Sequence, residues 1–188
     1  RDLNLYLRLL WVILRLFLRP AKLGPLDVSR LRMHVLPNDL DCNMHMNNGR
    51  YLTLMDLGRL DLIFRSGLYK AARAGHWIPL LNTAGIRFRL ELPCFQAYDL
   101  ETRILGWDEA WFTIEQRFIL RGGEKHGAVA AIALVRGAFF NRDARELVPV
   151  ASVKEAIGYS GDSPDLPDYA VKWLAAQDAL KQATSGGA

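Results

Sequence analysis

The sequence predicts an α+β domain in which an antiparallel sheet accompanies one long helix. The helix is predicted over about residues 48–69, because its apolar run is too long for a strand. The sheet is predicted from four later stretches, about residues 78–92, 98–107, 111–120 and 128–140, the third of which alternates apolar and polar side chains. With 188 residues and 51% apolar content, the chain can bury a sizeable core without metal or disulfide staples.

An apolar segment interrupted by arginines occupies residues 1–19, ahead of a linker near residues 20–28. As a helix, it would gather its polar residues within about a 60° arc. These residues are Arg1, Asn4, Arg8, Arg15 and Arg19. Two internal arginines make a membrane-spanning helix costly, and no small-residue cleavage site follows. A helix packed on its own domain or dimer partner is the favoured interpretation; a helix on a membrane surface and a poorly inserted span stay open.

The remaining elements complete one domain over residues 29–183. Leu31, Met33 and Val35 alternate with polar residues, which predicts a half-buried strand ahead of the long helix. Residues 128–133 are small on both faces, as close packing of the sheet against a helix requires. A short helix near residues 152–157, a proline-rich bend at 163–167 and an amphipathic helix at 169–183 follow, and the tail at 184–188 is predicted to be disordered.

Charge, cysteine and histidine content narrow the function classes. The net charge of +4 would suit the phosphates of coenzyme A, but it suits nucleic acid or anionic lipid equally well. No basic run or arginine–aromatic cluster stands out, so no nucleic-acid partner is predicted. Cys42 and Cys94 lack a CxxC spacing, which favours free thiols in a reducing, cytoplasmic compartment. The histidines have no paired ligand spacing, so no metal site is predicted.

Chemistry is predicted at residues 39–51, where two acids, a histidine and three amides precede the long helix. Asn47 or Asn48 can cap that helix by accepting from the free amides of its first turn. A helix N-terminus offers unpaired N–H groups and a partial positive charge, which would stabilise a carbonyl oxygen that gains negative charge. A carboxylate a few residues upstream could then act on the same carbonyl as a base or a nucleophile.

This string resembles the signature of the hotdog-fold acyl-CoA thioesterases, in the 4-hydroxybenzoyl-CoA thioesterase-like superfamily. That signature is Asp-x-Asp, a spacer ending in Gly, and His-x-Asn-Asn-x-x-Tyr; here Met44 replaces the usual Gly and the other positions are in register. Residues 55–59, 85–89, 102–108 and 115–118, and Leu166-Pro167 before Trp173, are similar to the thioesterase superfamily member 6 type. The resemblance covers roughly residues 31–180. It implies a hotdog fold, an antiparallel sheet wrapped around a long central helix, here with extra N- and C-terminal helices.

The resemblance also implies an activity and its residues. The activity is hydrolysis of an acyl thioester to a carboxylate and a free thiol, with coenzyme A or an acyl carrier protein as part of the substrate and no other cofactor. Asp41 would be the base or nucleophile, His45 its orienting partner or a thioester contact, and the Asn48 N–H the oxyanion donor. Asp56 on the central helix is the rival acid, and an ion pair with Arg59 is its alternative role.

Other motif residues are expected to contact the substrate or to form the fold around it. Asn47 is a helix cap or a substrate contact, and Tyr51 of the motif is assigned to substrate binding. Arg87 and Arg89 lie on one predicted strand, and Lys125 lies near a glycine-rich hairpin, so these cations are candidates for the coenzyme A phosphates.

The resemblance implies assembly as well, because members of this fold work as dimers with the site between subunits. A homodimer or a dimer of dimers is therefore expected. The alternative is that the protein is not an enzyme. It would then be a non-catalytic acyl-binding protein, or an interaction protein at a membrane surface. In that case the motif would be a remnant of the fold, and the N-terminal helix would be the functional part.

Overall fold

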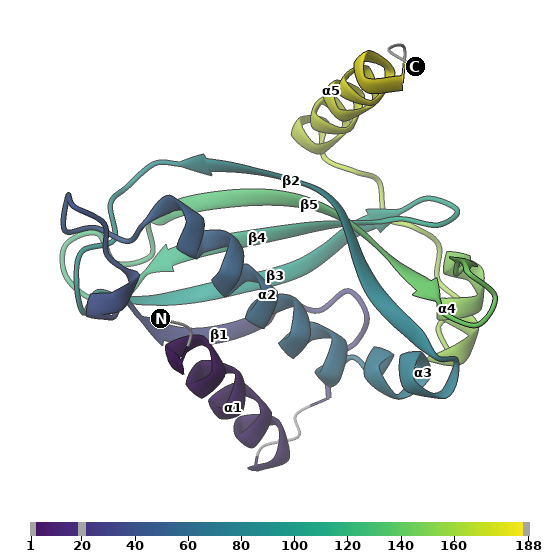
Figure 1. Cartoon of the computed structure of the whole chain (residues 1–188), viewed down its shortest axis with the longest axis horizontal. Helices are drawn as coiled ribbons and strands as arrows, with labels where there is room; N and C mark the ends of the chain where they lie inside the picture. Colours follow the sequence, from purple (N-terminus) through teal and green to yellow (C-terminus); the bar gives the residue numbers. More distant parts are fainter. Residues whose placement is uncertain (1–2, 19–21, 186–188) are drawn as a thin grey trace.

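The computed structural model describes residues 3–18 and 22–185 (Figure 1). In chain order the elements are α1 (Leu3–Leu18), β1 (Ser29–His34), a 3-10 turn η1 (Pro37–Asp39), α2 (Asn48–Arg65), α3 (Leu68–Ala74), β2 (Trp77–Phe88), β3 (Ala97–Trp107), β4 (Phe112–Leu120), β5 (Val129–Asn141), β6 (Glu146–Leu147), α4 (Val150–Ala156) and α5 (Asp168–Ser185). The predicted strands and helices are thus present, with shifts of a few residues at their ends.

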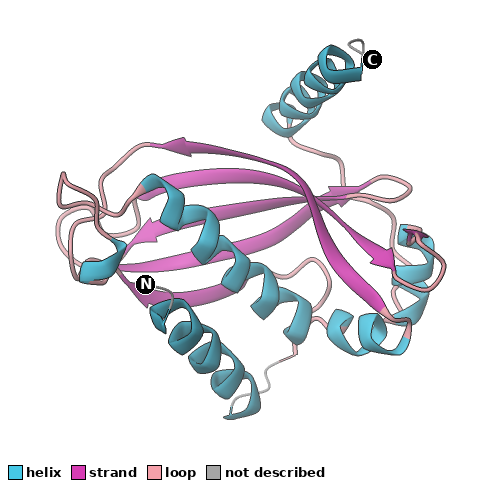
Figure 2. Ribbon diagram, viewed as in Figure 1, coloured by secondary structure: helices cyan, strands magenta, loops and turns pink. Residues whose placement is uncertain are grey.

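The strands form one curled antiparallel sheet in the order β1-β3-β4-β5-β2, and the short β6 pairs with β5. Helix α2 lies along one face of this sheet (Figures 1 and 2). Interruptions in the pairing register of β2 and β3, between Leu81 and Thr83 and between Ile104 and Gly106, add local twist to the strands. The α+β class predicted from the sequence is confirmed.

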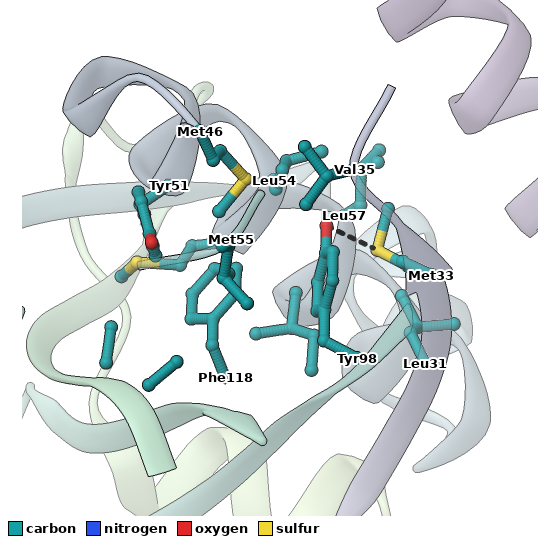
Figure 3. Packing of buried hydrophobic residues seen from close by; sticks show 14 of the residues in the cluster. Leu31, Met33, Val35, Met46, Tyr51, Leu54, Met55, Leu57, Tyr98 and Phe118 are labelled. Atoms are coloured by element: carbon teal, nitrogen blue, oxygen red, sulfur yellow. Dashed lines mark hydrogen bonds between the residues drawn. The ribbon is translucent and has the colours of Figure 1, made fainter. Parts of the chain in front are cut away.

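The main core lies between α2 and the sheet. Leu54 and Met55 of α2 are fully buried against Phe118 and Tyr98 of the sheet (Figure 3). Small residues allow the helix to come close: Ala130, Ala131 and Ala133 of β5 are buried, as the sequence predicts. Gly58 marks the tightest approach, because a Cβ atom there would lie 2.6 Å from the Thr102 Oγ1 atom.

The long helix is shorter than predicted. It ends at Arg65, where the Ser66 hydroxyl donates to the Leu62 carbonyl at 2.7 Å. Gly67 follows with φ of 85°, a left-handed conformation that breaks the helix and starts α3. At the other end of the chain, Thr184 belongs to α5 rather than to the predicted disordered tail, and residues 186–188 lie outside the described residues.

Helix α1 packs against the edge of the sheet through its arginine stripe. The Arg8 guanidinium donates to the His34 carbonyl at 3.2 Å, and the Arg15 guanidinium donates to the Arg30 carbonyl at 3.3 Å. Both carbonyls belong to the edge strand β1, so α1 occupies groups that an edge strand otherwise leaves unpaired. Val12, which is 1% exposed, joins the main core beside them.

One side of helix α5 contacts the opposite face of the sheet. Ala84 and Ile86 of β2 pack into the core on the α2 side, whereas Gly85 between them contacts the Trp173 ring of α5. The Tyr169 hydroxyl of α5 donates to the buried Glu115 carboxylate at 2.5 Å.

The Glu115 carboxylate also accepts from the Arg103 and Arg117 guanidiniums. Burial alone would raise the pKa of Glu115, but the hydrogen bonds from Arg117 and Tyr169 and the charges of both arginines lower it below its usual value. The carboxylate therefore stays charged and holds the start of α5 on the sheet.

Candidate active site

Asp39 organises the loop that leads into α2. Its side chain is fully buried and accepts from the Arg8 Nη2 atom at 2.5 Å, the Leu36 N–H at 2.9 Å and the Arg50 Nε atom at 3.2 Å. Its carbonyl accepts from the Asn47 N–H at 2.8 Å. With these partners Asp39 ties α1, the loop and the first turn of α2 together, which is a structural position rather than that of an acid open to substrate.

Asp41 lies two residues further, in a tight turn that leaves its carboxylate half-buried. One carboxylate oxygen accepts from the Asn43 N–H at 2.9 Å, and the Asp41 carbonyl accepts from the Met44 N–H at 3.1 Å. The Asp41 N–H donates to the His45 carbonyl at 2.9 Å and closes the turn. These bonds hold Asp41 in an ordered turn of the loop that leads into α2.

Met44 takes the conformation that the family's glycine would favour. Its φ is 62°, in the left-handed region, and its side chain is exposed. The turn therefore forms despite the missing glycine, at a conformational cost of about 1 kcal/mol or more.

We expect Met44→Gly to raise the free energy of unfolding by roughly 0.5–1 kcal/mol, because glycine removes the left-handed strain. Asn43→Gly is the matched control, since Asn43 is exposed in the same turn and does not have a positive φ. Urea unfolding of both variants measures the difference. A loss of stability in Met44→Gly equal to that in Asn43→Gly would contradict the assignment of strain.

His45 is directed to a different carboxylate from the predicted one. Its Nε2 atom lies 3.0 Å from the Glu91 Oε2 atom, in the connection between β2 and β3. The backbone of His45 also bridges to Pro93 in that connection. The ring of His45 is therefore paired with Glu91, and not with Asp41 as the motif predicts.

The first turn of α2 carries one capped and one open amide. The Asn47 side chain accepts from the Gly49 N–H at 2.8 Å, so Asn47 is the helix cap that the sequence predicts. The Asn48 N–H has no hydrogen-bond partner within residues 3–18 and 22–185. An open amide at a helix N-terminus is a donor suited to an oxyanion.

Tyr51 and Asp56 lie in contrasting environments along α2. Tyr51 is 3% exposed, and its ring packs against Phe88 and Phe118 with centroids 4.9 Å and 4.7 Å away. Burial raises the pKa of Tyr51 to about 12, so the phenol stays neutral. Asp56 has an exposed carboxylate that pairs with Arg59, as its alternative role predicts. Tyr51 is thus a core residue in this chain, and Asp56 is an ion-pair partner.

Two cavities flank these residues. The polar cavity, of about 550 Å³, is lined by His45, Arg89, Leu90, Glu91, Pro93, Gln96, Leu120, Gly122, Gly123, Glu124 and Lys125. The apolar cavity, of about 260 Å³, is lined by Asp56, Arg59, Leu60, Leu62, Ile63, Leu68, Pro79, Leu80, Leu81, Ile104, Phe112, Ile114, Gly137, Ala138 and Phe139. Arg89 and Lys125, two of the three predicted phosphate-binding cations, line the polar cavity, whereas Arg87 is not among its lining residues.

Three residues that position this site are not found by the sequence analysis. Arg8 and Arg50 hold Asp39, and Glu91 pairs with His45. The arginine stripe of residues 1–19 is the only sequence signal for Arg8, and it does not indicate that Asp39 is the partner of Arg8. Nothing in the local pattern distinguishes Glu91 or Arg50 from solvated charges.

The described residues do not meet the requirements of a metal site, a disulfide or a membrane-spanning helix. Residues 3–18 and 22–185 contain no group of three or more His, Cys, Asp or Glu side chains placed to hold a metal ion. Cys42 is exposed and Cys94 partly exposed, and both are free thiols. Within the same ranges, no helix has the length and apolar character needed to cross a bilayer.

The curled sheet around α2 defines the class of protein: a hotdog fold of the kind found in thioesterases. The structure of YbaW, a probable thioesterase from Escherichia coli, matches with a TM-score of 0.62 at 19% identity, covering 68% of this chain and 95% of the other. SAV2348 from Staphylococcus aureus, solved in complex with CoA, matches with a TM-score of 0.60 at 12% identity, covering 79% and 94%. The predicted hotdog fold is therefore confirmed.

Sequence comparison identifies the family. The chain belongs to the Thioesterase-like superfamily, whose profile matches residues 35–174. It is 31% identical over 182 residues to Protein THEM6 of Danio rerio, covering 97% of this chain and 86% of the relative. It is also 25% identical over 140 residues to the probable thioesterase YBR096W of Saccharomyces cerevisiae, covering 73% and 57%. The resemblance to the thioesterase superfamily member 6 type is thus confirmed.

Proposed function

We propose that this protein hydrolyses an acyl-CoA thioester to a free acid and coenzyme A. The observation that supports the proposal is an ordered turn at Asp41, seven residues before the open Asn48 amide at the α2 N-terminus. The thioester oxygen would accept from the Asn48 N–H, which stabilises the negative charge that develops there. Asp41 would activate water as a base, and the thiolate of coenzyme A would leave. As a nucleophile, Asp41 would instead displace the thiolate and form a mixed anhydride, which water then hydrolyses to the free acid.

A second copy of the chain would complete the site. β2 lies at one end of the sheet and pairs only with β5 among the described strands. An antiparallel two-fold pairing of β2 with its copy would place the first half of one strand beside the second half of the other. Pro79–Leu81 line the apolar cavity, and Arg89 lines the polar cavity just beyond the other end of the strand. The apolar cavity of one chain would thus lie near the Asp41 loop of its partner and receive the acyl group.

Steady-state hydrolysis of an acyl-CoA series with increasing chain length, with the free thiol detected, tests the proposal. We expect turnover of at least part of the series, and matched acyl carrier protein thioesters then separate the two carriers. Binding of acyl-CoA without thiol release would instead favour the non-catalytic acyl-binding alternative. Absence of both binding and turnover would contradict the proposal.

The polar cavity provides a test of coenzyme A binding. We expect Arg89→Ala and Lys125→Ala each to raise KM roughly tenfold with kcat little changed, because each loses one charged contact to phosphate. The KM values should also depend less steeply on salt. Arg87→Ala is the matched control, because Arg87 lies two residues before Arg89, near the end of β2, and does not line the cavity. Equal KM values in wild type and all three variants would show that Arg89 and Lys125 do not bind coenzyme A.

A further inference from the structure

We propose that α1 binds the surface of a lipid bilayer with anionic headgroups through its outer face. That outer face consists of Tyr6, Leu7, Leu10, Trp11 and Leu14, whose exposed fractions range from 43% to 66%. On a helix these positions span an arc of about 140°, so they form one continuous apolar surface. Contiguous exposed apolar surface of this kind marks an interaction site.

The contacts between α1 and the rest of the protein orient this apolar face toward the solvent. Arg8 and Arg15 of the arginine stripe, which runs beside this face, contact Asp39 and the β1 carbonyls. Turning the helix to bury its leucines would remove Arg8 from the buried Asp39 carboxylate, which is costly in a desolvated site. The buried ion pair between Arg8 and Asp39 thus keeps the apolar face exposed.

The size of the face favours a membrane over a second copy of the chain. Stable protein interfaces bury about 800 Å² on each partner and involve roughly 20–30 residues a side, far more than one helical face offers. An interfacial helix needs only a single apolar face, and Trp and Tyr are the side chains that suit the boundary between headgroups and lipid tails. Tyr6 and Trp11 provide both.

The charge of α1 complements anionic headgroups. The segment Leu3–Leu18 contains no acidic residue. The Arg15 guanidinium lies 5.7 Å from the centre of the Trp11 ring, which places a cation at the border of the apolar face. The whole chain carries a net charge of +4. A helix lying in the plane of such a surface, between the bilayer and the sheet, satisfies both its apolar and its charged sides.

Co-sedimentation of the full chain with vesicles tests the proposal. The vesicles contain phosphatidylcholine alone or with phosphatidylglycerol. We expect binding to the mixed vesicles that weakens as salt is raised, and a roughly thirtyfold weaker partition for the double variant Leu7→Gln, Leu10→Gln. The matched control is Val171→Gln, Leu180→Gln, which removes two exposed apolar side chains from α5 and should bind like wild type.

Each other outcome counts against the proposal. Failure of wild type to sediment with the mixed vesicles, or equal binding by the α1 variant, would overturn it. Sedimentation velocity without lipid provides the second measurement. A smaller assembly for the α1 variant than for wild type would assign the outer face to a second copy of the chain. All substituted residues are exposed, and melting curves verify that both variants stay folded.

Discussion

Asp41→Asn is expected to lower kcat by roughly a hundredfold or more, since general base catalysis contributes at least that factor. The fold should be unaffected, because an asparagine side chain can still accept from the Asn43 N–H and keep the turn. The measurement is steady-state turnover of the best acyl-CoA substrate, with melting temperature as the check on folding.

Asp56→Asn is the control for this experiment, because Asp56 is the rival acid and has its own cation in Arg59. We expect it to cost much less activity than Asp41→Asn. Equal turnover by wild type and Asp41→Asn would remove Asp41 from the mechanism. The reverse ranking of the two variants would transfer the catalytic role to Asp56 and to the apolar cavity that it lines.

Arg8→Met should lower the free energy of unfolding by about 3 kcal/mol, because it leaves the fully buried Asp39 carboxylate without one of its two cations. For a chain of this length, that loss corresponds to a fall in melting temperature of roughly 6–12 °C. Turnover should fall as well, since Asp39 holds the loop that carries Asp41. Thermal unfolding, with turnover measured on the same samples, provides both readouts.

Arg15→Met is the matched control, because Arg15 lies on the same stripe but its described contact to β1 is a single carbonyl at 3.3 Å. Its cost should stay below about 1 kcal/mol. Adding Asp39→Asn to Arg8→Met should restore part of the stability, because the buried side chain that lost one cation is then neutral. Equal losses in Arg8→Met and Arg15→Met would show that the ion pair does not hold α1.

The fold was predictable because its signals are local. Alternation in β4, the small residues of β5 and the motif before α2 each depend on neighbours in the chain, so a single sequence displays them. The end of α2 was missed although Gly67 is visible, because the apolar pattern continues through Leu68 into α3. The helical spacing of apolar residues continues past Gly67, although the left-handed conformation of Gly67 ends the helix there.

The site was only partly predictable, because its remaining partners come from distant segments. The cap at Asn47 follows from sequence, but the pairing of His45 with Glu91 joins residues on different connections. In the predicted stripe, Arg8 and Arg15 both turn toward the protein, whereas Arg1 and Arg19 lie outside the described residues. Which side of the helix faces the protein depends on a buried carboxylate at Asp39, and periodicity does not contain that information.

The two outer strands of the sheet differ in what they leave open to a neighbour. α1 donates to carbonyls along the outer side of β1, whereas β2 keeps its outer side free among the described residues. A sheet continued from β2 to its copy would therefore end in a β1 strand on both sides, each already occupied by a helix (Figure 1). Strand addition would stop after one step. In such a dimer, the docking of α1 on β1 would hinder further strand addition and oppose growth into a fibre.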